Sequence, residues 1–150
     1  QLIGCNTFGH LASGTHEIQR IGDDTASTWK RNRRMGVNTL AFRAAQHGHF
    51  FVADPDIVAI VKNFPWELSQ QWLRLVSQSG TALFTSIDPA IVEEKHRKAL
   101  RQALETASQP QPIAEPLDWM ETDCPRRWKL MGKTVEFEWM GESGAWPFTD

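Results

Sequence analysis

The sequence predicts an α/β fold with parallel strands, followed by a β region. Over residues 1–108, short apolar runs alternate with longer amphipathic stretches, which is the pattern of successive βα units. These residues hold roughly three and a half units, whereas a closed (β/α)8 barrel needs about 250 residues. A proline-rich segment follows at 109–116, and beyond it apolar residues recur at every second position. We therefore expect half of a barrel in residues 1–108, a linker at 109–116 and the start of a C-terminal β domain at 117–150.

Apolar runs and turn residues assign the elements of the first sixty residues. The expected strands are residues 2–5, 17–21 and 50–53. The third should stop at Pro55, because proline cannot donate a hydrogen bond to a β-ladder. One helix should pass through Trp29 to about residue 34, and a second should cover about 38–46. Side chains with oxygen atoms that could cap the first helix are Asp23, Asp24 and Thr25.

Residues 65–139 contain stronger helix and hairpin patterns. The expected elements are a helix that begins at Pro65 and is closed by Gly80, a strand at 81–85, a helix from Pro89 to about Thr106, and a hairpin of 128–131 with 134–139. Asp88 is the expected cap of the helix that begins at Pro89. A turn at Gly132 and Lys133 should join the two strands of the hairpin. A lone hairpin is not stable in water, so this region needs a surface to pack on.

Composition and charge disfavour several classes of partner. Sixteen Lys and Arg against eighteen Asp and Glu give a net charge of −2, so the chain offers no general attraction to nucleic acid. No apolar run approaches the ~18 residues of a membrane-spanning helix. The two cysteines and five histidines lack the spacing of metal ligands, so we expect neither a metal nor a cofactor. The cysteines favour a reducing compartment only weakly, and the sequence leaves open a cytoplasmic or a secreted protein.

Residues that follow the expected strands should gather at one edge of the sheet, where the active sites of such folds lie. Four such strand ends are Cys5 with Asn6, Arg20 to Asp24, Asp54 to Asp56, and Ser86 to Asp88. Carboxylates beside an arginine suit a polyhydroxylated ligand, because they accept hydrogen bonds from sugar hydroxyls and can transfer protons. An interpretation without catalysis stays open, since Asp24 and Asp88 stand where helix caps commonly stand. A serine hydrolase is disfavoured by the lack of a G-x-S-x-G motif.

Three motifs resemble the α-galactosidase (melibiase) family of glycoside hydrolases. Residues 20–29, RIGDDTASTW, resemble the family's acid/base segment, in which an Arg at the end of barrel strand six is followed four residues later by the catalytic Asp, then by Thr and Trp. Residues 53–56, ADPD, resemble the strand-seven motif, with Ala53 in place of Asn. Residues 80–86, GTALFTS, resemble the strand-eight segment, and Cys5 with Asn6 stands where strand five carries a Cys and a sugar-contacting residue. Order and spacing agree over about residues 2–108.

The resemblance implies retaining hydrolysis of terminal α-galactosides by a (β/α)8 barrel that is followed by a β-sandwich domain. By position, Asp24 would be the general acid/base and Arg20 would hold both the sugar and the acid. Cys5 and Asn6 would line the pocket near the sugar's 2-position. Many members carry Glu where this chain has Asn6, so N-acetylgalactosamine or a pentopyranose could be the preferred sugar. The residues expected to support the barrel mouth are Asp54, Asp56 and Ser86.

The family's nucleophile is an Asp at the end of strand four, and we expect it in the missing N-terminal half of the barrel. Retaining chemistry needs two carboxyl groups about 5–5.5 Å apart, so this chain alone should be inactive on its oligosaccharide or galactoside substrate. Oligomers are compatible with the sequence. Two alternatives remain, namely a non-catalytic carbohydrate-binding or structural α/β fragment, and a complete small α/β domain with another function.

Overall fold

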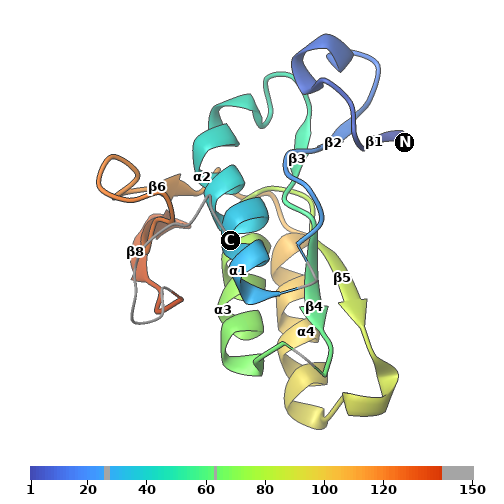
Figure 1. Ribbon diagram of the computed structural model, residues 1–150, viewed down its shortest axis with the longest axis vertical. Coiled ribbons are helices and arrows are strands. Elements are labelled where there is room, and N and C mark those ends of the chain that lie inside the picture. Colours follow the sequence, from blue (N-terminus) through green and yellow to red (C-terminus); the bar gives the residue numbers. More distant parts are fainter. Residues whose placement is uncertain (26–27, 63, 140–150) are drawn as a thin grey trace.

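The computed structural model describes residues 1–25, 28–62 and 64–139, which form a mixed α/β fold of small sheets and short helices (Figure 1). Its parallel strands are β1 (Ile3–Gly4), β2 (Ile18–Arg20), β3 (Val52–Asp54), β4 (Ile57–Ile60) and β5 (Phe84–Ile87). The first three pair in chain order, and β4 pairs with β5. The α/β class expected from the sequence is therefore confirmed.

The third expected strand ends before Pro55 as predicted: β3 stops at Asp54, and a separate strand, β4, begins at Ile57 and pairs with β5. Proline has no N–H to donate, and Asp56 has a φ of 71°, so these two positions separate the β2–β3 ladder from the β4–β5 ladder. The Ala82 N–H donates to the Ala53 carbonyl at 3.0 Å, which places the approach to β5 beside β3. The strand expected at 81–85 begins later than predicted, at Phe84, where pairing with β4 starts.

A single helical run replaces the two helices expected between residues 29 and 46. It consists of α1 (Trp29–Asn32), the π-helix η2 (Arg33–Asn38), α2 (Thr39–Arg43) and the 3₁₀ turn η3 (Ala44–Gln46). The hydroxyl of Thr28 caps its start by accepting the Arg31 N–H at 3.1 Å. The prediction that Asp23, Asp24 and Thr25 cap this helix was wrong, because the helix begins only at Trp29.

The remaining helices are the 3₁₀ turn η1 (Gly9–Ala12), α3 (Trp66–Ser77), the 3₁₀ turn η4 (Pro89–Ile91) and α4 (Glu94–Ala107). Pro65 directly precedes α3, and Gly80 adopts the left-handed conformation expected of it, with a φ of 79°. The helix expected from Pro89 is split, because the backbone is extended at Val92 and Glu93. Asp88 caps the short first piece by accepting the Ala90 N–H at 2.9 Å, so its predicted role as a cap is confirmed.

The C-terminal part forms a small antiparallel sheet of β6 (Glu115–Pro116), β7 (Arg127–Leu130) and β8 (Lys133–Glu136). The expected hairpin is confirmed, but its turn lies one residue earlier, at Met131 and Gly132. Both turn residues have positive φ, 48° and 79°, which suits a two-residue hairpin loop. Residues 110–114 of the proline-rich segment are irregular, and the segment's last two residues form β6.

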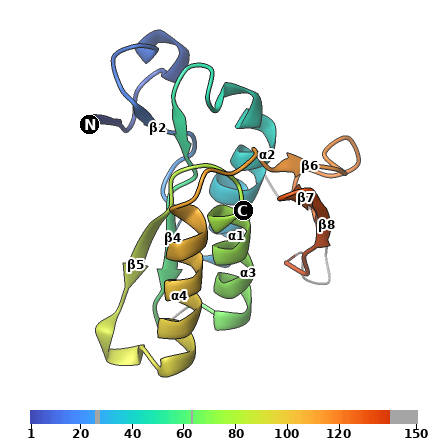
Figure 2. The ribbon, with the colours of Figure 1, turned by 180° about the vertical axis from the view of Figure 1, so that it is seen from behind.

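A shared apolar core joins the helices to this sheet. Trp72 of α3, Trp128 of β7 and Trp139 are fully buried in the same cluster, and the Phe137 and Trp139 rings stack with centroids 4.3 Å apart. In both views, α1, α2 and α3 lie between the parallel strands and the β6–β8 sheet (Figures 1 and 2). The hairpin thus packs on the helical layer. Within the part of the chain that the structure describes, no helix combines the length and apolar character needed to cross a membrane.

Candidate active site

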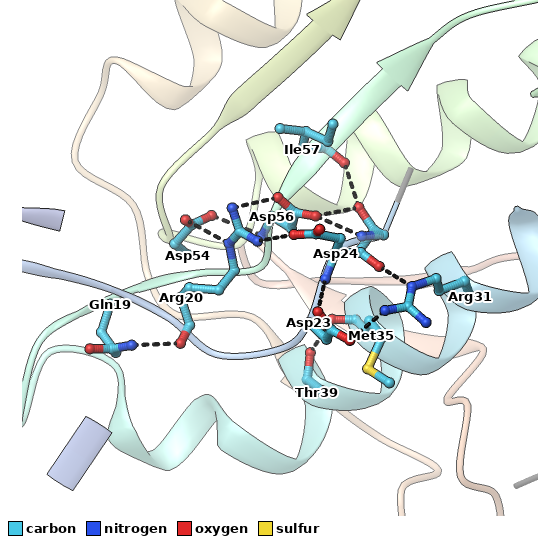
Figure 3. Close-up of polar contacts among 11 residues, drawn as sticks. Gln19, Arg20, Asp23, Asp24, Arg31, Met35, Thr39, Asp54, Asp56 and Ile57 are labelled. Carbon is cyan, nitrogen blue, oxygen red and sulfur yellow. Dashed lines mark hydrogen bonds and ion pairs between the residues drawn. The ribbon is translucent and has the colours of Figure 1, made fainter. Parts of the chain in front are cut away.

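The candidate site forms where β2 and β3 end side by side. Arg20 and Asp54 are register partners in these parallel strands, so their side chains leave the sheet at the same edge. The Arg20 Nε donates to Asp54 Oδ2 at 3.1 Å (Figure 3). Thirty-four positions separate the two residues in the chain, and the parallel pairing alone brings them together.

One guanidinium group bridges three carboxylates. Besides Asp54, the Nη2 of Arg20 lies 2.7 Å from Asp56 Oδ1, and its Nη1 lies 3.2 Å from Asp24 Oδ1. The Asp54 and Asp56 side chains are only 3% and 4% exposed, whereas that of Asp24 is 83% exposed. Burial by itself would lower the pKa of Arg20, but the hydrogen bond to Asp54 and the charges of Asp56 and Asp54 outweigh burial and raise it. Arg20 is therefore a permanent cation between two buried acids and an exposed one.

Asp56 connects this network to the chain that follows Asp24. Its left-handed backbone directs its N–H to Asp54 Oδ1 at 2.8 Å. Its Oδ2 accepts the Thr25 N–H at 2.7 Å and also the Thr25 hydroxyl at 2.9 Å. Every oxygen of the two buried carboxylates thus has a donor from the chain itself, which is the condition for burying such charges.

A second arginine holds the loop that carries Asp24. The Nε of Arg31 donates to the Asp24 carbonyl at 2.6 Å, and its Nη2 pairs with the Asp23 carboxylate. The other oxygen of Asp23 accepts the Asp24 N–H at 2.8 Å. That backbone hydrogen bond, together with the Arg31 charge, lowers the pKa of Asp23. Asp23 is therefore an ionised anchor whose two oxygens are both engaged.

Gly22 lets this loop lie directly against the π-helix. A Cβ at Gly22 would stand 2.2 Å from the Met35 carbonyl oxygen, so no other residue fits without movement of the backbone. The Thr39 hydroxyl donates to the same carbonyl at 2.6 Å, which fills the oxygen's remaining hydrogen-bonding capacity (Figure 3). The helical run thus packs directly against the loop at Gly22.

Only one carboxylate oxygen of this cluster has no contact within the described residues, and it is the Oδ2 of Asp24. Both oxygens of Asp23, Asp54 and Asp56 accept hydrogen bonds or form ion pairs, as given above. Asp24 uses Oδ1 for Arg20 and exposes the rest of its carboxyl group. Of the four acids, Asp24 therefore has the most exposed carboxyl group.

The other expected site residues lie at different distances from the network. Cys5 and Asn6 directly follow β1, the neighbour of β2, and both are exposed; the φ of Asn6 is 55°. The Cys5 thiol is near enough to affect the pKa of Arg20. Ser86 lies within β5 opposite Ala59, and Ala59 is three positions beyond Asp56 in the chain. No contact among the described residues joins Ser86 to the acids.

Sequence reasoning did not include Arg31 or assign Thr25 its contact with Asp56. Arg31 lies eight residues after its partner Asp23, across a loop, so no helical i,i+4 spacing connects the pair. The sequence shows only that a cation stands in the first turn of the helix that follows the loop. Within the described ranges, no group of three or more His, Cys, Asp or Glu side chains is arranged to hold a metal ion.

Comparison with known proteins gives no independent assignment. A scan against models of protein families found no match, and a search of curated proteins found no significant relative.

Proposed function

We propose that residues 1–108 are the C-terminal half of the (β/α)8 barrel of a retaining glycoside hydrolase that cleaves terminal α-galactoside-like residues. The observation that carries the proposal is Asp24 Oδ2, the carboxylate oxygen of the four-acid cluster that has no contact among the described residues, beside an arginine at the carboxyl edge of parallel strands. Active sites of barrel enzymes lie at this edge. The resemblance of residues 20–29 and 53–56 to the α-galactosidase motifs supports the same assignment.

Asp24 is the general acid/base in this proposal. It protonates the departing oxygen in the first step and accepts a proton from the incoming water in the second. Arg20 orients the Asp24 carboxyl group through Nη1 and hydrogen-bonds the sugar, while Asp54 and Asp56 hold the guanidinium in place. Cys5 and Asn6 border the sugar near its 2-position. The nucleophilic carboxylate comes from the N-terminal half of the barrel.

Several features of the fold support the barrel assignment. Strands β1 to β3 pair in chain order, β4 pairs with β5 in a second sheet, and all three pairings are parallel. Right-handed crossovers in a barrel place every helix outside the strands. Helix α4 lies behind β4 in Figure 1 and in front of it in Figure 2, and α3 lies next to α4 in both views. In this scheme residues 109–116 link the barrel to a β-sandwich domain that begins within 117–150.

The test is the Asp24→Asn substitution in the complete enzyme that joins this chain to the nucleophile-bearing half. We expect hydrolysis of unactivated α-galactosides to fall by about 10²–10⁴, the usual contribution of a positioned general acid/base. Aryl galactosides with an activated leaving group should lose least in the first step, and azide should restore their turnover because it attacks without a base. Asp88→Asn is the matched control, because this partly buried cap keeps an acceptor oxygen and has no contact with the four acids among the described residues. Normal activity of Asp24→Asn on unactivated galactosides would overturn the assignment.

The alternative is a non-catalytic carbohydrate-binding or structural α/β fragment. It is favoured by the complete satisfaction of Asp54 and Asp56 within the chain, since such a network can stabilise a fold without any ligand. An assay of aryl α-galactoside hydrolysis by the complete protein distinguishes the glycosidase from this alternative. Under the alternative, the complete protein does not turn over aryl α-galactosides at any pH.

A further inference from the structure

One arginine and one aspartate bind both peptide groups that flank the Asp24 Cα. The peptide before it donates its N–H to Asp23 Oδ1, and the peptide after it accepts from Arg31 Nε. The Nη2 of Arg31 closes the ring by pairing with the other oxygen of Asp23. A planar guanidinium can make both contacts at once, because its donors lie in a fixed fork. The main chain at Asp24 is thereby held from both sides.

Arg31 is itself held at the start of the helical run. Its backbone N–H donates to the Thr28 hydroxyl at 3.1 Å, which caps α1. The same run continues into the π-helix that meets Gly22, so the loop is fixed to one rigid support at two points. The Asp24 side chain has, in contrast, the single described contact with Arg20 Nη1.

We propose that Arg31, together with Asp23, is a positioning residue that fixes the Asp24 main chain and so sets the direction of its carboxyl group toward the leaving-group oxygen. The inference rests on the proposed role of Asp24. Arg31 acts through Asp24 and does not touch the substrate. If its guanidinium is removed, the Asp24 backbone can rotate, and one exposed ion pair with Arg20 does not keep the carboxyl group in place.

The experiment compares Arg31→Ala and Arg31→Lys in the complete enzyme. We expect Arg31→Ala to lower kcat on unactivated galactosides by about 10- to 100-fold, the cost of misplacing a catalytic group by about 1 Å, with KM nearly unchanged. On activated aryl galactosides the loss should be several times smaller. Arg31→Lys should give an intermediate rate, because an ammonium group can replace one donor of the fork but not both.

Stability separates this role from a structural one. The side chains of Arg31 and Asp23 are 37% and 58% exposed, and exposed ion pairs contribute little to folding. The unfolding midpoint of Arg31→Ala should therefore remain close to that of the parent protein. Arg127→Ala is the matched control, because it removes an arginine that is 44% exposed and pairs with Glu121 far from the site. It should alter neither the rate nor its dependence on the leaving group.

A double substitution tests the route of the effect. When Asp24 is already Asn, no acid remains to be positioned, so adding Arg31→Ala should lower the rate no further. Three results would each overturn the positioning role. They are a double variant whose rate loss equals the product of the two single losses, an Arg31→Ala loss that is equal on both substrate classes, and a large rise in KM. If Asp24→Asn lowers activity and Arg31→Ala does not, the positioning role fails and the role of Asp24 stands. If Asp24→Asn leaves activity intact, the proposed function fails, and the positioning role fails with it.

Discussion

Replacing Arg20 by Met would leave two buried carboxylates without their cation. The Met side chain is of similar length and apolar, so the change removes mainly the charge and the donors. Asp54 and Asp56 are 3% and 4% exposed and would keep their backbone and hydroxyl donors from Asp56 and Thr25. They would, however, face each other as like charges in a site that water hardly reaches. We expect a large loss of folding stability.

The magnitude follows from the burial of each partner. Removing one member of a buried ion pair costs about 3–5 kcal/mol, because an uncompensated charge stays in the interior. The contact with exposed Asp24 adds little, since water screens it. Arg20 is itself 18% exposed, so we take the lower end, about 3 kcal/mol. With a urea dependence of about 2 kcal/mol per molar, the unfolding midpoint should fall by about 1.5 M.

Urea unfolding at one fixed protein concentration measures this shift. The control is the variant that carries Asp54→Asn and Asp56→Asn together with Arg20→Met, in which no buried charge remains and an acceptor oxygen is kept at each position. It should regain most of the lost stability, because replacing a whole buried ion network costs far less than breaking it. A midpoint shift below about 0.5 M, or a triple variant no better than Arg20→Met, would refute the reasoning.

Three further predictions concern other parts of the chain. Burial lowers the pKa of His47, although its interaction with the Gly80 backbone opposes this, and its neutral Nδ1 accepts a β3 N–H at 3.0 Å. His47 therefore binds a proton near pH 6.5 in the unfolded chain but only at lower pH in the folded chain. Folding stability should fall as the pH drops below about 6.5. In urea titrations, His47→Asn should weaken this dependence of stability on pH. Cys5 is exposed, whereas burial raises the pKa of Cys124 to about 12, so iodoacetamide should modify Cys5 in the folded protein and Cys124 only after denaturation. Ile3 and Phe8 are 50% and 77% exposed, and β1 is an edge strand of the sheet that the described residues form. The isolated chain should therefore self-associate in sedimentation velocity, and a monomer at all concentrations would contradict the fragment hypothesis.

Local patterns of apolar residues predicted most helices and strands. Where the prediction differed from the structure, contacts between residues far apart in the chain account for the difference. The parallel strands and the hairpin follow from runs of apolar residues that any short window of the sequence reveals. The run at 57–60 is equally apolar, but the sequence prediction assigns it no element, and its pairing with β5 shows that it is a strand. The close packing of the π-helical segment is also a tertiary effect, because a Cβ at Gly36 would lie 2.9 Å from the Trp72 ring. No sequence window contains that contact.

The candidate site was predictable to the extent that its spacing is local. Arg20 and Asp24 are four residues apart, and their ion pair follows that expectation. The pairing of Arg20 with Asp54 required the strands to lie in parallel register, which the motifs anticipated through the order of the strand ends. The contact of Arg31 with Asp23 depends on how a loop returns to a helix, and nothing in the residue pattern encodes that geometry. Sequence therefore located the acids but not the residue that holds them in place.

The two arginines allow the catalytic and the structural interpretation to be separated by experiment. Arg20 contacts buried charges, so its loss should lower stability under either interpretation. Among the described residues, the polar contacts of the Arg31 side chain are with Asp23 and Asp24 in the loop, so its loss should leave stability nearly unchanged under both. A structural fragment has no reason to show any further effect of Arg31, whereas a glycosidase should lose turnover in proportion to the proton demand of the leaving group. The dependence of the Arg31→Ala rate on the leaving group is therefore the property that only a catalytic Asp24 explains.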